Sequence, residues 1–142
     1  MVRAVPLIHA ELTPLPNNLI PNAAGSLLTT APDYARFLLQ VLRPPGDGPL
    51  ALSRHLHAAL QTPHARLNRW LSWGLGWGLA DEAGERLLWH WGDNMIFQSF
   101  ALLDPARGWG VVVLTNSSRG LKVCGRIITH LVGRSLAAFL WL

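Results

Sequence analysis

The chain has a single cysteine among its 142 residues, and this scarcity excludes two kinds of centre. One thiol, Cys124, can form no internal disulfide and cannot build a metal site from several cysteines. Its position in a helical pattern favours a buried thiol that packs as a small hydrophobic side chain. His55, His57 and His64 give no better metal site, because residues two apart on a helix point to different faces. We therefore expect no metal, no cofactor and three solvent-facing histidines.

Charged residues are also few. They make up 14% of the sequence, whereas 50% of it is hydrophobic, so a packed core is expected and disorder is not. The formal net charge of +4 comes from basic residues that are scattered along the chain and form no run. Surfaces that bind nucleic acid normally show clustered Lys and Arg, so we expect no nucleic-acid partner.

Long apolar runs are missing as well. The apolar stretch at residues 135–142 is far too short to span a bilayer. Residues 1–16 are interrupted by charge and proline and lack the pattern of a secretion signal. The sequence indicates no membrane contact and leaves the cellular location open.

Two helices are predicted in the first half of the chain. Thr30 and Asp33 flank a proline, which is a typical helix start. Apolar residues then recur at helical spacing, so one face should be buried: Tyr34, Phe37, Leu38, Val41 and Leu42. The prolines and glycine at residues 44–46 should end this helix. A shorter helix is expected between Ser53 and Pro63, and its inward residues should be Leu56, Ala59 and Leu60.

From residue 70 onward the pattern changes from a helical period to alternation. In residues 73–79 bulky side chains alternate with glycines, which predicts a strand whose smooth face another backbone or a ligand can approach. Further strands are expected at residues 86–91, 97–103 and 109–115. The short loops between these strands imply antiparallel pairing.

A closing helix is predicted at residues 121–132. Its apolar face should lie on the sheet through Val123, Ile127, Ile128 and Leu131. No repeat or linker divides the chain, so residues 1–142 should form a single domain with an irregular lead-in at residues 1–22. The expected fold class is α+β, with an antiparallel sheet of about four strands, a C-terminal covering helix and two N-terminal helices.

Several segments match a known pattern in order. They are NAAGSLLTTAPDYARF at residues 22–37, WGLGW at 73–77, HWGDN at 90–94, and LDP and VVVLTN at 103–105 and 111–116. Together they resemble the C-terminal portion of the serine β-lactamase-like family, which includes class C β-lactamases, DD-peptidases and related esterases of the penicillin-recognising fold. HWGDN is similar to the family's third catalytic motif in its His-x-Gly form.

This resemblance implies roles for five consecutive residues. His90 would be the basic group that lies near the substrate carboxylate or supports the proton relay. The backbone N–H of Asp93 would be one of two donors that stabilise the charge on a tetrahedral intermediate. Gly92 would let the substrate approach, and Trp91 and Asn94 would contact it.

The family's chemistry also needs a Ser-x-x-Lys and a Tyr-x-Asn. The only lysine, Lys122, has Arg119 three residues before it, and the only tyrosine, Tyr34, precedes Ala35 and Arg36. Neither motif exists here, so we interpret the chain as a C-terminal fragment of such a hydrolase, inactive alone. Two alternatives stay open. The chain could be half of a two-chain enzyme, joined by the missing N-terminal half or another chain through an open sheet edge. It could instead be a stand-alone binding or structural module without catalysis.

Overall fold

The structure, a computed structural model, describes residues 22–43, 46 and 51–142. The lead-in expected at residues 1–22 lies almost wholly outside them. The helices are α1 (Ala31–Leu42), α2 (Arg54–Gln61), α3 (Gly120–Val132) and α4 (Ala138–Trp141). The strands are β1 (Ala65–Arg66), β2 (Leu71–Trp73), β3 (Gly78–Glu82), β4 (Glu85–Asn94), β5 (Phe97–Asp104) and β6 (Trp109–Thr115).

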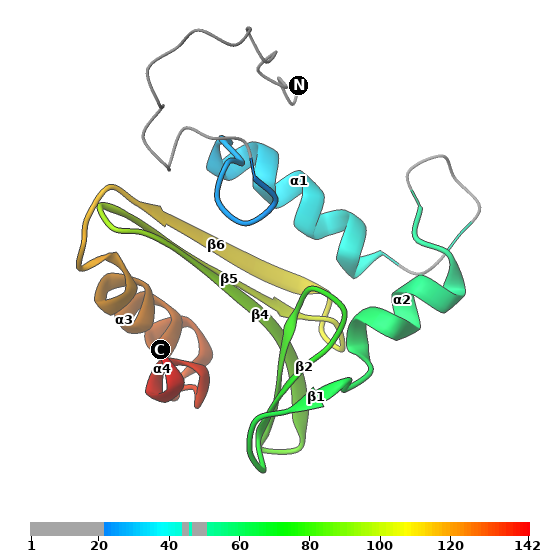
Figure 1. The fold of residues 1–142 in the computed structure, drawn as a ribbon. Helices are drawn as coiled ribbons and strands as arrows, with labels where there is room; N and C mark the ends of the chain where they lie inside the picture. Colours follow the sequence, from blue (N-terminus) through cyan, green and yellow to red (C-terminus); the bar gives the residue numbers. More distant parts are fainter. Residues whose placement is uncertain (1–21, 44–45, 47–50) are drawn as a thin grey trace, which may run out of the picture.

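All six strands lie in one antiparallel sheet, in the order in which they occur along the chain. Helices α1 and α2 lie on one face of it and α3 and α4 on the other (Figure 1). The α+β class is therefore confirmed. The estimate of about four strands was too low, because β1 and β2 are only 2 and 3 residues long and too short to show a period.

The single strand predicted at residues 73–79 is wrong. The chain leaves β2 and turns before β3 starts, and the N–H of Gly74 donates to the carbonyl of Trp77 at 2.7 Å. Gly76 takes a φ of 75°, which an L side chain rarely adopts. Alternation of tryptophan or leucine with glycine thus marks a tight hairpin here.

Two of the three glycines of this hairpin, Gly74 and Gly78, are covered by other parts of the protein and present no smooth face to a ligand. A Cβ on Gly74 would lie 2.3 Å from the carbonyl oxygen of Leu60 in α2. A Cβ on Gly78 would lie 2.4 Å from the indole of Trp89 in β4. The groups that come close to these glycines are the Leu60 carbonyl and the Trp89 indole of the protein itself.

Alternation along β4 builds a core on each face of the sheet. Leu87 and Trp89 point toward α3 and α4, and Leu88 points toward α1. The first core contains Leu71, Ala80, Leu87, Trp89, Phe100, Leu102, Cys124, Ile128, Leu136 and Ala138. The second contains Leu38, Val41, Trp77, Leu79, Leu88, Ala101 and Leu103. Both faces of the central strands are covered.

Helix α1 begins at the predicted cap, Thr30, and ends just before the expected proline stop. Leu38 and Val41 are buried as predicted. Phe37 is not, since it is 49% exposed and its ring stacks on that of Trp77 with centroids 6.4 Å apart. The predicted buried face was too wide, because only Leu38 and Val41 of α1 are buried in the core on this face of the sheet.

Helix α2 begins at Ser53, whose hydroxyl accepts from the third following backbone N–H. Leu56, predicted to face inward, is exposed, and no residue of this helix is fully buried. His55 and His64 are exposed as predicted, whereas His57 is half-buried. The short helix thus sits at the border of the sheet and is rotated from the predicted orientation.

Helix α3 also packs through a different face. Cys124 and Ile128 are fully buried, and burial raises the pKa of the Cys124 thiol. Three residues of the predicted face are exposed instead: Val123, Ile127 and Leu131. The rotation follows from Gly120, where a Cβ would lie 1.8 Å from the hydroxyl of Thr115 in β6. The absence of a side chain at Gly120 lets the first turn of α3 lie directly on the sheet.

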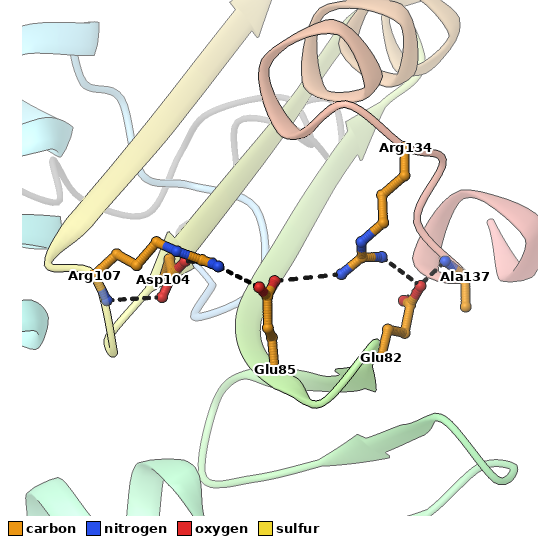
Figure 2. Close-up of polar contacts among 6 residues, drawn as sticks. All are labelled: Glu82, Glu85, Asp104, Arg107, Arg134 and Ala137. Carbon is orange, nitrogen blue, oxygen red and sulfur yellow. Dashed lines mark hydrogen bonds and ion pairs between the residues drawn. The ribbon is translucent and has the colours of Figure 1, made fainter.

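Ion pairs fasten the α3–α4 connection to the sheet (Figure 2). Arg134 donates to the carboxylate of Glu82 at 2.8 Å and pairs with Glu85 at 3.8 Å. The other oxygen of Glu82 accepts the backbone N–H of Ala137 at 2.9 Å. The turn between β3 and β4 therefore holds both ends of the loop that leads into α4.

Arg107 extends this network to the turn between β5 and β6 (Figure 2). Its guanidinium pairs with Glu85 and donates to Asp104 at 2.8 Å, and its backbone N–H donates to Asp104 at 3.0 Å. Hydrogen bonding from Arg107 lowers the pKa of Glu85. Burial works to raise the pKa of Asp104, but the hydrogen bonds from Arg107 outweigh it and the net pKa is lowered.

We expect Asp104→Asn to lower the free energy of unfolding by about 1–3 kcal/mol at neutral pH, because Arg107 loses its buried carboxylate partner. A carboxyl with a lowered folded-state pKa stabilises above its unfolded pKa, and this stabilisation disappears as the pH falls through the folded value. The variant should therefore lose less stability than the parent chain between neutral pH and about pH 3. Urea unfolding of the variant and the parent chain at several pH values measures this. Identical pH slopes for Asp104→Asn and the parent would contradict it.

Candidate functional site

The strand that carries HWGDN is paired on both sides for only half its length. β3 pairs with β4 from Glu82↔Glu85 to Gly78↔Trp89 and then departs into its hairpin. Residues 90–94 pair with β5 alone, within the part of the chain that the structure describes. The five residues predicted to form the site therefore lie along one free strand edge.

His90 lies at the start of this free edge and its side chain is exposed. Its Nδ1 lies 2.7 Å from the carbonyl oxygen of Trp91. A carbonyl can only accept, so this contact assigns the hydrogen to Nδ1 and leaves a lone pair on Nε2 in the neutral ring. The imidazole is thus oriented to accept or relay a proton through Nε2.

Tryptophans surround the imidazole. The ring of Trp91 stacks on it at a centroid distance of 5.5 Å, and Trp73 and Trp77 approach edge-on at 5.8 Å and 6.5 Å. Trp141 of α4 contacts Trp91 at 5.3 Å on the other side. This packing holds the His90 ring in place, and it also makes Trp91 half-buried rather than fully open to a substrate.

Gly92 has a structural reason of its own to be glycine. A Cβ there would lie 2.6 Å from the hydroxyl oxygen of Ser99, its register partner on β5. A side chain there would have to displace the Ser99 hydroxyl, so the neighbouring strand favours glycine in addition to the substrate approach that the resemblance implies.

The Asp93 side chain turns away from the free edge and organises the following hairpin. Its carboxylate accepts the backbone N–H of Met95 and the amide of Gln98, both at 2.9 Å. Gln98 in turn accepts the backbone N–H of Leu121 at 3.0 Å, at the first turn of α3. Met95 has a φ of 61°, a strained conformation that these bonds help to hold. The Asp93 carboxylate is thus a structural group, and only its backbone N–H is left for the predicted role.

Asn94 brings a distant segment to the site. Its side-chain amide donates to the carbonyl of Gly25 at 3.3 Å, across 69 positions of sequence. A Cβ on Gly25 would lie 3.2 Å from the Asn94 side chain. Sequence patterns matched both segments to the same family, but neither contained a signal for this contact or for the role of Gln98.

Within residues 22–43, 46 and 51–142, no group of three or more metal-binding side chains comes together. No helix among them is long and apolar enough to cross a membrane.

A family model described as Beta-lactamase matches residues 2–127. No curated protein matches the chain. Among solved structures it is similar to the octameric penicillin-binding protein homologue from Pyrococcus abyssi, with a TM-score of 0.66 and 22% identity. That likeness covers 81% of this chain and 27% of the other, so the chain spans about a quarter of the homologue's length.

The chain therefore belongs to the β-lactamase family, and it has the corresponding part of a penicillin-binding-protein-like fold. The resemblance drawn from the HWGDN strand and its flanking segments is confirmed at the level of family and fold.

We expect Gly92→Ala to lower the free energy of unfolding by about 1–3 kcal/mol, since the new methyl group overpacks against the Ser99 hydroxyl. Ser99→Ala should relieve most of this loss, because the Ser99 Cβ lies 4.0 Å from the built methyl position. Thermal or urea unfolding of the two single variants and the double variant gives the coupling energy. If the two effects are additive, positions 92 and 99 are not coupled, and contact with Ser99 does not explain the glycine.

Proposed function

We propose that this chain supplies one wall of a serine acyl-transfer site and is inactive without a second polypeptide segment. One observation carries the proposal. The segment that matches the family's third motif, with His90 and Gly92, lies along a free strand edge. The sequence contains no Ser-x-x-Lys and no Tyr-x-Asn. The complete site would transfer an acyl group from an amide, lactam or ester through a serine-bound intermediate.

In this proposal His90 contributes its Nε2 to the proton relay or to the substrate carboxylate. The backbone N–H of Asp93 donates to the oxyanion, and its low mobility on a sheet strand suits a preorganised donor. Asn94 faces the substrate from the end of the strand, tied to Gly25. Trp91 supports the His90 ring and contributes its exposed edge to the substrate wall.

The segment that completes the site would dock on the free sheet edges and on the apolar tip of the β4–β5 hairpin. Residues 90–94 of β4 and all of β6 lack a second strand neighbour among the described residues. Large apolar side chains are exposed at the tip and just before α1: Leu27, Leu28, Met95, Ile96 and Phe97. Unpaired strands beside apolar surface favour a protein partner over open water.

The chain alone should form no acyl-enzyme. We expect incubation with a fluorophosphonate or a fluorescent penicillin to leave its serines unlabelled, as measured by intact-protein mass spectrometry. The physical reason is that none of its serines has a lysine placed to activate it. Stoichiometric labelling of one serine would overturn the proposal.

Co-expression with a segment that carries the family's Ser-x-x-Lys and Tyr-x-Asn should restore turnover of a chromogenic lactam or ester. In the restored complex His90→Ala should lower kcat by about 100-fold or more, in keeping with loss of a proton-transfer group. His130→Ala, on the outer part of α3, is the matched control and should leave kcat unchanged. A soluble complex in which His90→Ala retains full activity would refute the role of His90.

A second candidate, a stand-alone binding or structural module, is favoured by the closed cores on both faces of the sheet. The stand-alone module and the incomplete acyl-transfer site predict different outcomes of the same co-expression. A module would unfold cooperatively by itself and would gain no turnover from the added segment, even when the two bind.

A further inference from the structure

A cleft of about 400 Å³ lies at the opposite end of the sheet from the HWGDN strand edge. Its walls come from the segment after α2, the β1–β2 hairpin and the first residues of β4. It is lined by Pro63, His64, Arg66, Asn68, Arg69, Trp70, Leu71, Ser72, Asp81 and Arg86. Arg86 and His90 are separated by about 13 Å along β4. The cleft is thus separate from the proposed acyl-transfer site.

The charges in this cleft are unbalanced. Three guanidinium groups, from Arg66, Arg69 and Arg86, face one carboxylate, Asp81. Arg86 occupies both oxygens of Asp81, at 2.6 Å and 2.8 Å. Arg66 and Arg69 form no ion pair with any described residue, and Arg69 lies over the Trp70 ring at 3.6 Å. The structure therefore leaves two arginines without an anion.

The polar groups of the cleft are also mostly donors. Asn68 uses its side-chain oxygen to accept the backbone N–H groups of Trp70 and Leu71, at 2.8 Å and 2.9 Å, so its NH₂ is left outward. Arg86 donates a third bond to the carbonyl of Gln61 at 2.9 Å, which fixes its orientation and leaves two N–H groups unused.

Ser72 adds a hydroxyl group to the donors of the cleft. The residue is 5% exposed, it lines the cleft, and its hydroxyl has no hydrogen-bond partner among the described residues. Its oxygen is not one of the fully enclosed polar atoms without a partner, so the hydroxyl reaches the cleft and is free to donate to a ligand atom there. Its register partners are Leu79 on β3 and Arg66 on β1, so a ligand bound by the Ser72 hydroxyl would also lie beside the Arg66 position.

The geometry points to a binding site for a small phosphate monoester in this cleft. A dianionic phosphate would match the two unpaired guanidinium groups of Arg66 and Arg69, and its oxygens would accept from the Ser72 hydroxyl and the Asn68 amide. The Trp70 indole, which is partly exposed, gives the organic part of the ligand an apolar wall. Arg86 serves as a fixed floor, because Asp81 and Gln61 already hold it.

Titration of the whole 142-residue chain with phenyl phosphate, followed by ligand-observed NMR at low salt, tests this site. We expect saturable binding that weakens as salt screens the charges. Arg66→Gln combined with Arg69→Gln should raise Kd by about tenfold or more, and Ser72→Ala should raise it by a smaller factor. Lys122→Gln with Arg126→Gln removes the same charge from α3 and should leave Kd unchanged.

Three comparisons identify the ligand's source. Inorganic phosphate should compete with phenyl phosphate, and benzoate, with one charge and no phosphate, should compete less well. Vesicles that contain phosphatidic acid should bind no better than vesicles of neutral lipid. Absence of saturable binding, equal loss of binding in the α3 control, or binding to vesicles alone would each overturn the proposal.

Discussion

Strand β4 pairs with two strands and contributes side chains to two cores, and the rest of the molecule depends on this strand. Its first half pairs with β3 and β5 and sends Leu87 and Trp89 into one core and Leu88 into the other. Its second half continues past the point where β3 departs. The sheet period keeps side chains alternating through this transition, so the same regularity that fills two cores presents His90 on an open edge.

The sequence was most informative where a regular period was long. Strands β4, β5 and β6 and helices α1 and α3 were found close to their bounds, because each is long enough to show its period. The pattern misled at residues 73–79, since alternating glycines are compatible with a strand until a turn uses their conformational freedom. β1 and β2 contain too few residues to show any period.

The residues of the candidate site were found in the sequence by a short motif, and their roles stay predictions. This motif could be located because His90, Gly92 and Asn94 fall within five consecutive residues, and the family assignment followed from the order of several such segments. The supports of the site could not be located in that way. Gln98 links Asp93 to the start of α3, and Gly25 meets Asn94 across 69 positions. Such contacts depend on how the layers stack, which no local pattern records.

β6 has a further consequence for how the chain behaves in solution. Its seven residues, Trp109–Thr115, include three consecutive valines but no charge and no proline. Natural sheets usually guard an outer strand with lysine, proline or a bulge, because a bare edge is a template for stacking identical strands into fibrils. Nothing in β6 discourages such stacking. An edge of this kind makes pairing through β6 the route by which copies of the chain would associate, and a partner that occupies the edge would block it.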